Sequence, residues 1–191
     1  INGSSVRYVE RFASRRFATP ADAFFVDAGV TYSGAPVTTI SAGLGHLEGE
    51  TVSILGDGAV RPPQVVTGGS ITLDQPASKL QIGLAYNSDL QTLPAAFEAQ
   101  AFGQGRQKNV NAVWMRVNQS AGWSVGPTFD RLTEAKIRTT EPYGSPPSLR
   151  SGEVKTVVGP VCQDDGFICI RQANPLPLTV VSMTMELAVG G

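Results

Sequence analysis

The sequence predicts an all-β protein on the basis of two patterns. Apolar residues alternate with small or polar ones in short runs, at Thr51–Ile54, Ser70–Leu73 and Leu80–Tyr86. A period of two gives a strand one buried face and one face in water. Turn residues separate the runs, and Asp57-Gly58 tolerates the positive φ of a two-residue hairpin. Short strands with frequent turns predict a small barrel or sandwich over residues 24–92.

Residues 1–23 are predicted to be a lead-in to this domain. Asn2-Gly3 is a hairpin signal, but only Ile1 remains of the strand that should precede it. We therefore expect the lead-in to be left from a larger upstream β domain; the alternative is a genuine terminus that begins with a turn. A strand is expected over residues 5–11. Thr19-Pro20-Ala21-Asp22 predicts a helical turn, because threonine can cap a helix, proline suits its first position and an acid accepts from a free backbone donor.

Residues 93–191 predict a second antiparallel β domain, similar to a sandwich. Proline near the start and glycine after the end predict a short helix near residues 94–102. The last strand is the clearest, because every odd position from Val181 to Val189 is apolar. We expect this strand to be paired deep within its sheet. Further strands are expected at 110–118, 137–139, 154–158 and 167–171.

Candidate catalytic and metal-binding residues are few. His46 is the only histidine, so a Ser-His-Asp triad or a histidine base would have to use it, and no nucleophile motif accompanies it. One histidine and two cysteines lack the spacing of a zinc site. Glu48, Glu50, Asp164 and Asp165 could bind a cation, but no calcium-loop pattern surrounds them. We therefore predict no catalytic residue, no cofactor and no metal, in a protein that is not an enzyme.

Cys162 and Cys169 are a candidate disulfide. If Asp165-Gly166 forms a two-residue hairpin turn, counting outward places the two cysteines opposite each other, within the range of a disulfide. Two free, half-buried thiols are the alternative if the protein assembles in a reducing cytoplasm. The sequence leaves both alternatives open.

Composition limits the partners that the chain can have. The formal net charge of −1 argues against a dedicated nucleic-acid-binding protein. No apolar run approaches the about 20 residues of a membrane helix. Arg15 and Arg16 could touch a partner's carboxylates or a phosphate, although a solvated surface pair is the simpler explanation. Exposed aromatic side chains could stack on sugar rings, and the candidates are Trp114, Trp123, Tyr32 and Tyr143.

Several strand-and-turn phrases carry a family resemblance. They are Ile1–Gly3 with Val6–Arg11, Asp22–Tyr32, Gly45–Val52, Gly56–Gly58, Gly69–Asp74, Gly83–Tyr86, and Ile170–Gln172 with Pro175–Val180. In this order they resemble the C-terminal part of tail tubular or nozzle-type structural proteins of short-tailed bacteriophages and prophages. Phe24–Tyr86 is also similar to the first catalytic cysteine half-domain of ubiquitin-activating enzymes, which is a small β-barrel. That stretch contains no cysteine, so ubiquitin chemistry is set aside.

The resemblance implies a non-enzymatic virion component in the phage tail, assembled in the cytoplasm of the bacterial host. Such a scaffold would pack against other copies of itself and other tail proteins in a ring, around a channel for DNA that it does not bind specifically. Whether the isolated chain is monomeric stays open. A carbohydrate- or receptor-binding β module that uses the aromatic residues above is the alternative. A hydrolase with a composite site between subunits, which would need His46, is a third hypothesis.

Overall fold

The described residues of the chain fold almost entirely as antiparallel β-sheets. The computed structural model describes residues 5, 7, 9–95, 107–137, 140–142, 144–161 and 165–189. The helices among them are two 3-10 turns of three residues each. In this part of the chain no helix is long and apolar enough to cross a bilayer. The predicted all-β class is therefore confirmed.

The chain divides into two compact units, each assembled from several segments. Unit 1 comprises residues 1–86, 138–148 and 174–177, and unit 2 comprises residues 87–137, 149–173 and 178–191. The predicted boundary was between residues 92 and 93, whereas the first segment of unit 1 ends at Tyr86. The difference arises because residues 88–91 form a strand that pairs with residues 169–172, late in the chain.

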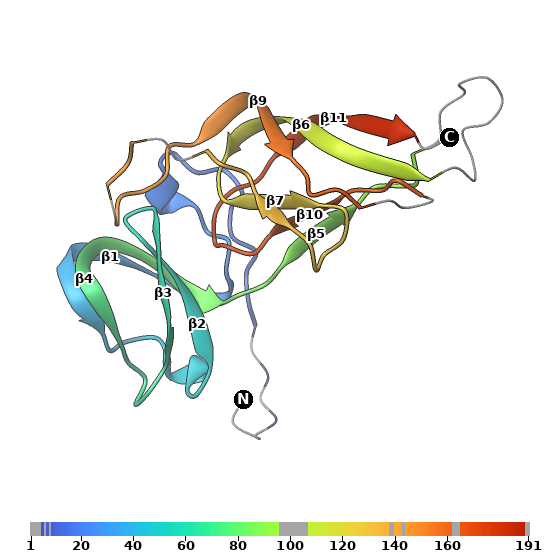
Figure 1. The fold of residues 1–191 in the computed structure, drawn as a ribbon. Coiled ribbons are helices and arrows are strands. Elements are labelled where there is room, and N and C mark those ends of the chain that lie inside the picture. The colour runs from blue at the N-terminus through green and yellow to red at the C-terminus, as the bar shows by residue number, and fades with distance from the viewer. Residues whose placement is uncertain are drawn as a thin grey trace. The chain divides into compact units, whose positions relative to one another are not determined.

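Unit 1 contains one four-stranded sheet with the order β1-β4-β2-β3 (Figure 1). Its elements are η1 (Pro20–Asp22), β1 (Asp27–Ile40), η2 (Gly45–Leu47), β2 (Thr51–Gly56), β3 (Ala59–Val65) and β4 (Ile71–Leu84). β4 pairs with β1 along both of its halves and with β2 along its second half. Within the described residues no ladder joins the edge strands β1 and β3. The sheet is therefore open, and the closed barrel predicted for residues 24–92 is not detected.

The two long strands of unit 1 bend around a continuous apolar core. Figure 1 shows the curvature of β1 and β4, and their ladder shifts register after Asp27, Ser33 and Val37. Such bulges let a long strand turn without losing its partner. The buried residues of the core are Ile40, Leu44, Leu47, Val52, Ile54, Val66, Ile71, Leu73, Ala77, Leu80 and Ile82. The strands predicted from alternation in β2 and at the start of β4 are thus confirmed.

Local turn chemistry also matches the sequence. Asp57 and Gly58 join Gly56 of β2 to Ala59 of β3 with φ angles of 51° and 83°, as a two-residue hairpin turn requires. Pro62-Pro63 lies in β3, an edge strand, where a missing backbone donor costs no ladder bond. η1 starts after Thr19, and the Asp22 carboxylate accepts hydrogen bonds from the Thr19 backbone N–H and hydroxyl.

The strand expected over residues 5–11 is not formed in the described residues. Ser5, Arg7 and residues 9–11 lie outside any strand and are exposed. A strand needs a neighbour to satisfy its backbone groups, and among the described residues none pairs with this segment. The half hairpin at residues 1–3 lies outside the described residues, so the larger upstream domain stays a prediction.

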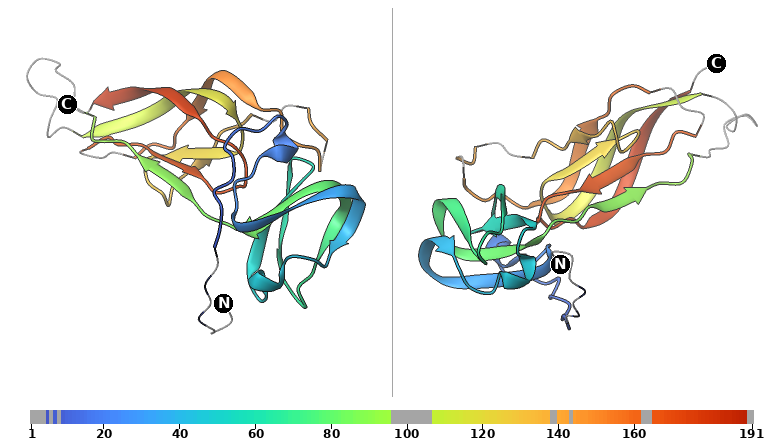
Figure 2. Two further views of the ribbon diagram at one scale, coloured as in Figure 1. Left: turned by 180° about the vertical axis from the view of Figure 1, so that it is seen from behind. Right: turned by 90° about the horizontal axis from the view of Figure 1, so that it is seen from below.

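Unit 2 is a two-layer β-sandwich-like body (Figures 1 and 2). One sheet has the order β5-β10-β7-β8 and the other the order β11-β6-β9. The strands are β5 (Ser88–Gln91), β6 (Lys108–Ser120), β7 (Trp123–Gly126), β8 (Thr133–Glu134), β9 (Arg150–Val157), β10 (Cys169–Gln172) and β11 (Val180–Val189). Ala121 and Gly122 carry the chain from β6 into β7, and so from one sheet to the other. Buried side chains of both sheets include Val113, Met115, Trp123, Val125 and Ile170.

The last strand is where the sequence analysis was most clearly wrong. β11 forms and alternates as predicted, with Met183, Met185 and Leu187 half-buried. It lies at an edge of its sheet instead of deep within it, and none of its residues is fully buried. Periodicity reports which face of a strand is apolar but not how many neighbours the strand has, so this position is decided by tertiary structure.

The other predictions for unit 2 have mixed outcomes. Strands at 110–118, 154–158 and 167–171 correspond to β6, β9 and β10, with shifted ends. Pro94 and Ala95 are not helical, and residues 96–102 of the expected helix lie outside the described residues. Of the strand expected at residues 137–139, Ile137 is not in a strand, and residues 138–139 lie outside the described part of the chain.

At Gly83, β4 lies so close to β1 that there is no room for a side chain. An added Cβ there would lie 2.5 Å from the Asp27 carbonyl oxygen and 2.8 Å from the Gly29 Cα, so β1 would have to move away from β4. Gly83→Ala is expected to lower the free energy of unfolding by about 1–3 kcal/mol, as overpacking typically does. Urea unfolding measures this, with Gly45→Ala as the control because no atom lies within 4 Å of an added Cβ at that position. Equal stability of the two variants would contradict the packing described for β1 and β4.

Candidate functional site

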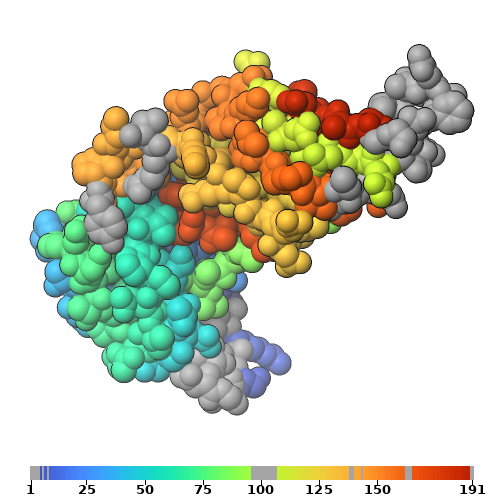
Figure 3. Space-filling model, viewed as in Figure 1, coloured from blue at the N-terminus to red at the C-terminus, as the bar shows by residue number. Residues whose placement is uncertain are grey.

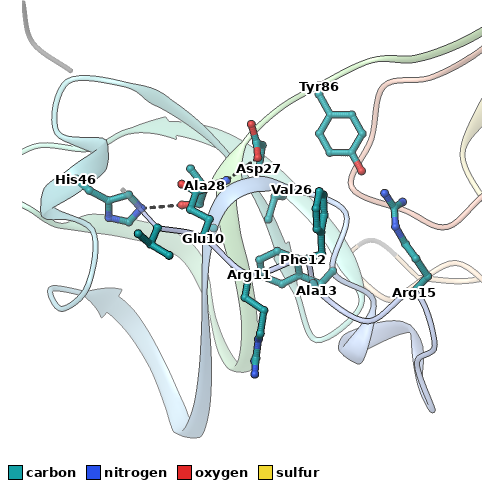
Figure 4. A pocket seen from close by; sticks show the side chains of 13 residues that line it. Glu10, Arg11, Phe12, Ala13, Arg15, Val26, Asp27, Ala28, His46 and Tyr86 are labelled. Carbon is teal, nitrogen blue, oxygen red and sulfur yellow. Dashed lines mark hydrogen bonds between the residues drawn. The ribbon is translucent and has the colours of Figure 1, made fainter. Parts of the chain in front are cut away.

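The larger hollow of unit 1 lies between the N-terminal arm (residues 9–17) and the start of β1. It has a volume of about 650 Å³. Its walls are residues 9–13 and Arg15 of the arm, residues 24 and 26–29, His46 and Tyr86. In the view of Figure 4, His46 lies on one side, and Arg15 and Tyr86 lie on the other. The arm side of the hollow is exposed, with Val9 and Phe12 in full contact with solvent.

A bulge at the start of β1 shapes the floor of the hollow. Ala28 has a φ of 48°, in the left-handed region that residues with a Cβ rarely adopt. The Asp27 carboxylate accepts a hydrogen bond from the Ala28 N–H at 3.0 Å and so holds this turn. Gly29 follows, where an added Cβ would lie 2.6 Å from a Val26 methyl group. The bulge turns the Ala28 carbonyl toward His46 (Figure 4).

His46 holds this carbonyl. Its Nε2 lies 2.6 Å from the Ala28 oxygen, and a carbonyl oxygen can only accept, so Nε2 carries the proton and donates it. Glu10 and Asp27 also line the hollow, and the described bond of Asp27 is to the backbone. In the described residues no group of three or more His, Cys, Asp or Glu side chains is placed to hold a metal ion. The described contacts give His46 a part in the shape of the β1 bulge.

A second hollow, of about 460 Å³, shares part of its lining with the first and is lined by several cations. Arg11, Arg16 and Lys79 face it, together with one acid, Asp22. Lys79 forms an ion pair with Asp22, and both side chains are about 30% exposed. This hydrogen bond from Lys79, and next that from Thr19, lower the pKa of Asp22 from 3.8 to about 2. Sequence analysis singled out Asp22 for its place in the helical turn but missed Lys79, which is 57 residues away.

The arginine pair of the arm is divided between the two hollows. Arg15 lines the first, and its guanidinium lies 5.5 Å from the centre of the Phe25 ring, in cation–π geometry. Phe17 packs edge-on against the same ring at 6.2 Å between centroids. Arg16 lines the second hollow. Phe25 therefore anchors the end of the arm, while the part before it stays exposed.

Of the acids that sequence analysis considered for cation binding, Glu48 uses its carboxylate to bind backbone N–H groups, and the bonds described for Glu50 and Asp165 are made by their main-chain carbonyls. The Glu48 carboxylate accepts hydrogen bonds from Gly68 N–H at 2.8 Å and Gly69 N–H at 2.6 Å, in the turn that leads into β4. The Glu50 carbonyl accepts from Val66 N–H. The Asp165 carbonyl accepts from Ala95 N–H, and Asp164 lies outside the described residues.

The candidate aromatic residues have different positions. Trp123 is fully buried in unit 2, so it is a core residue. The Tyr32 hydroxyl donates to the Ala35 carbonyl at 2.8 Å, within a bend of β1. Trp114 is half-buried in the middle of β6. The Lys155 ammonium lies over the Trp114 ring, 4.5 Å from its centre. Tyr143 lies outside the described residues.

Of the two candidate cysteines, only Cys169 lies in the described residues, in the middle strand β10. Cys169 pairs with Gln91 of β5 on one side and with Gly126 of β7 on the other, so both sides of its backbone are occupied. It is buried and described as a free thiol, and burial raises the pKa of this group, with the nearby Asp89 carboxylate adding to the effect. Cys162 lies outside the described residues, so the disulfide stays a prediction.

Comparison with known proteins identifies no family for this chain. No protein-family model matches the sequence, and no curated protein is significantly similar to it.

The ion pair at Asp22 predicts a specific pH dependence. The folded pKa of about 2 is below the 3.8 of the unfolded state, so the pair stabilises the fold above about pH 4 and this contribution is lost as the pH falls toward 2. Asp22→Asn should therefore be less stable than the native protein near pH 6, and the difference should shrink below pH 4. Urea unfolding across this range measures it, and Lys79→Met should show the same convergence. A difference that stays constant down to about pH 2 would contradict the assignment.

Proposed function

We propose that this chain is a non-enzymatic structural component of the tail of a short-tailed bacteriophage or prophage. In this role it packs against other copies of itself and other tail proteins in a ring around the DNA channel. One observation carries the proposal: the described residues leave long strand edges and large apolar side chains without a partner. Val9 and Phe12 of the arm, Val157 of β9 and Val181 of β11 are all more than half exposed.

Exposed apolar residues of this kind are typical of surfaces that another protein covers. Single exposed apolar residues are common on any protein, but here two of them lie on the two edge strands of one sheet. Unpaired strand edges are a hazard that monomeric proteins suppress. An assembly protein has a use for them, because subunits that join through strands gain backbone hydrogen bonds as well as apolar contact.

The assignment to a phage tail, rather than to some other assembly, is supported by the sequence resemblance described above. A net charge of −1 suits a conduit for DNA, since strong contacts to phosphates would hold a passing duplex. In the proposed setting the protein is assembled in the host cytoplasm and then resides in the virion. The role needs no cofactor and no catalytic residue.

Electron microscopy of particles tests this proposal. Phage or prophage particles from cells that encode this chain are labelled with an antibody against residues 107–137, and the label is expected at the tail in several copies per particle. A cryo-microscopy map should show density for two β units repeated around the channel. Label on the head, or particles that lack the chain, would refute the tail assignment.

A carbohydrate- or receptor-binding role is the second candidate, and the position of Trp114 favours it. Trp114 shares the outer face of the three-stranded sheet with Lys155 and Thr184, its direct neighbours in the ladder. An aromatic ring beside a cation and a hydroxyl can stack on a sugar and bind an acidic group.

Glycan-array binding tests this second role. Trp114→Ala is expected to abolish any binding, whereas Val157→Ala on the same face should leave it unchanged. Binding that survives Trp114→Ala, or no binding by the native chain, would remove this candidate. Trp123→Ala is unsuitable because that side chain belongs to the core.

A further inference from the structure

As far as the described residues go, the three-stranded sheet of unit 2 ends in two unpaired edges, β9 and β11. Within the described residues each of these strands pairs only with β6. The Val158 N–H donates to Asn111 of β6, and the Asn118 N–H of β6 donates to Thr179 before β11. Because successive residues of a strand point their backbone groups to opposite sides, residues 153, 155 and 157 of β9 point theirs away from β6. Asn118 of β6 faces β11, so residues 116 and 114 do too, and their partners Ser182 and Thr184 point their backbone groups toward β6. Residues 183 and 185 of β11 therefore point theirs outward.

The β11 edge carries few of the devices that usually protect a strand edge. Those devices include proline, lysine, β-bulges and short length. β3 carries Pro62-Pro63, β8 has only two residues, and β1 contains a proline and several bulges. β11 has ten residues, no proline and no cation, and Glu186 is its one charged residue. Its protection is limited to two register shifts in the ladder with β6, between Val180 and Ser182 and between Glu186 and Leu187. Val181 in this strand is 61% exposed.

The β9 edge complements the β11 edge in charge and in apolar surface. Lys155 pairs with Trp114, and Glu186 pairs with Ala112, so the cation and the acid lie on the same face of the sheet at its opposite edges. β9 also offers an exposed valine, since Val157 is 67% exposed. Figure 3 shows β9, in orange, and β11, in red, on the surface of the molecule. Two β11 edges would bring no cation to Glu186, whereas β9 brings Lys155.

We propose that β11 of one copy of this chain pairs with β9 of a second copy, so that neighbouring three-stranded sheets join head to tail. β9 and β11 are both antiparallel to β6 and therefore run in the same direction. Copies related by rotation about a ring axis along the strands keep that direction, so the new pair is parallel. Contacts between unlike surfaces can repeat and close into a ring, which a two-fold contact cannot do.

The register of this pair follows from the faces of the two strands. Residues 153, 155 and 157 of β9 share the outer face with residues 182, 184 and 186 of β11. Pairings that keep the outer faces aligned place Glu186 beside Lys155 or Val157 of the second copy. The half-buried stripe of Met183, Met185 and Leu187 on the inner face then gains a neighbour on its open side. This inference rests on the proposed function, because it names the contact through which copies assemble.

Two edge variants test the proposal with the full chain. Val181→Lys adds a charge to the β11 edge, and Val157→Glu places an acid where Glu186 of the second copy arrives. Both side chains are largely exposed, so both variants should fold, as circular dichroism can confirm. Sedimentation velocity is expected to show concentration-dependent assembly of the native chain and at least about tenfold weaker self-association of each variant, as like charges and added edge charges cause.

Mixing the two variants is the decisive experiment. The Val181→Lys chain keeps a native β9 edge, and the Val157→Glu chain keeps a native β11 edge. An equal mixture is therefore expected to form a complex of two chains that grows no further. Val65→Lys is the matched control, because Val65 is a 53% exposed valine at the end of β3, an edge strand of unit 1, and this variant should assemble as the native chain does.

Three outcomes would overturn the inference. They are a native chain that stays monomeric at every concentration, a Val157→Glu chain that assembles normally, and a mixture that forms no complex. The second outcome would point to a two-fold pairing of β11 with itself. Failure of the edge contact would leave the tail assignment intact if the particles carry the chain at the tail, so the two proposals fail separately.

Discussion

The structure depends on the pairing of backbone N–H and C=O groups between antiparallel strands. With only two 3-10 turns as helices in the described residues, almost all local order comes from strand ladders. Strands in the middle of a sheet, such as β4, β10 and β6, satisfy both of their sides. Strands at the edges satisfy one, and the other side must be solvated or given a partner. This constraint accounts both for the two sheet-based units and for the surfaces that they leave open.

Carboxylates in this protein serve mainly to hold bends in the strands. Asp57, in the hairpin turn, accepts from the Ser78 and Lys79 N–H groups of the bend in β4. Glu48 holds the Gly68-Gly69 turn, and Asp27 holds the bulge at Ala28. A charge-assisted bond to a backbone N–H is stronger than a neutral one, so an acid at each bend compensates for ladder bonds lost there. Glu48, Asp27 and Asp57 thus have structural partners in unit 1.

In the proposed role, this framework would meet its neighbours at sheet edges instead of in a cleft. β9 and β11 differ in charge and share exposed valines, although they belong to one sheet and contact the same central strand. An enzyme concentrates unsatisfied polar groups around a substrate, whereas an assembly protein spreads them along lines that a neighbour can match. The proposed head-to-tail contact is the one through which copies would assemble at the proposed location in the tail.

The sequence by itself determined the features that depend on near neighbours in the chain. Alternation identified β2, β6 and β11, and residue chemistry identified the Asp57-Gly58 turn and η1, because these signals act over a few residues. Tertiary structure alone decided that β11 lies at an edge, that the sheet of unit 1 stays open, that Trp123 is core, and that Lys79 meets Asp22. A periodic pattern fixes which face of a strand is apolar, but the number and identity of its neighbours arise from contacts between residues far apart in the chain.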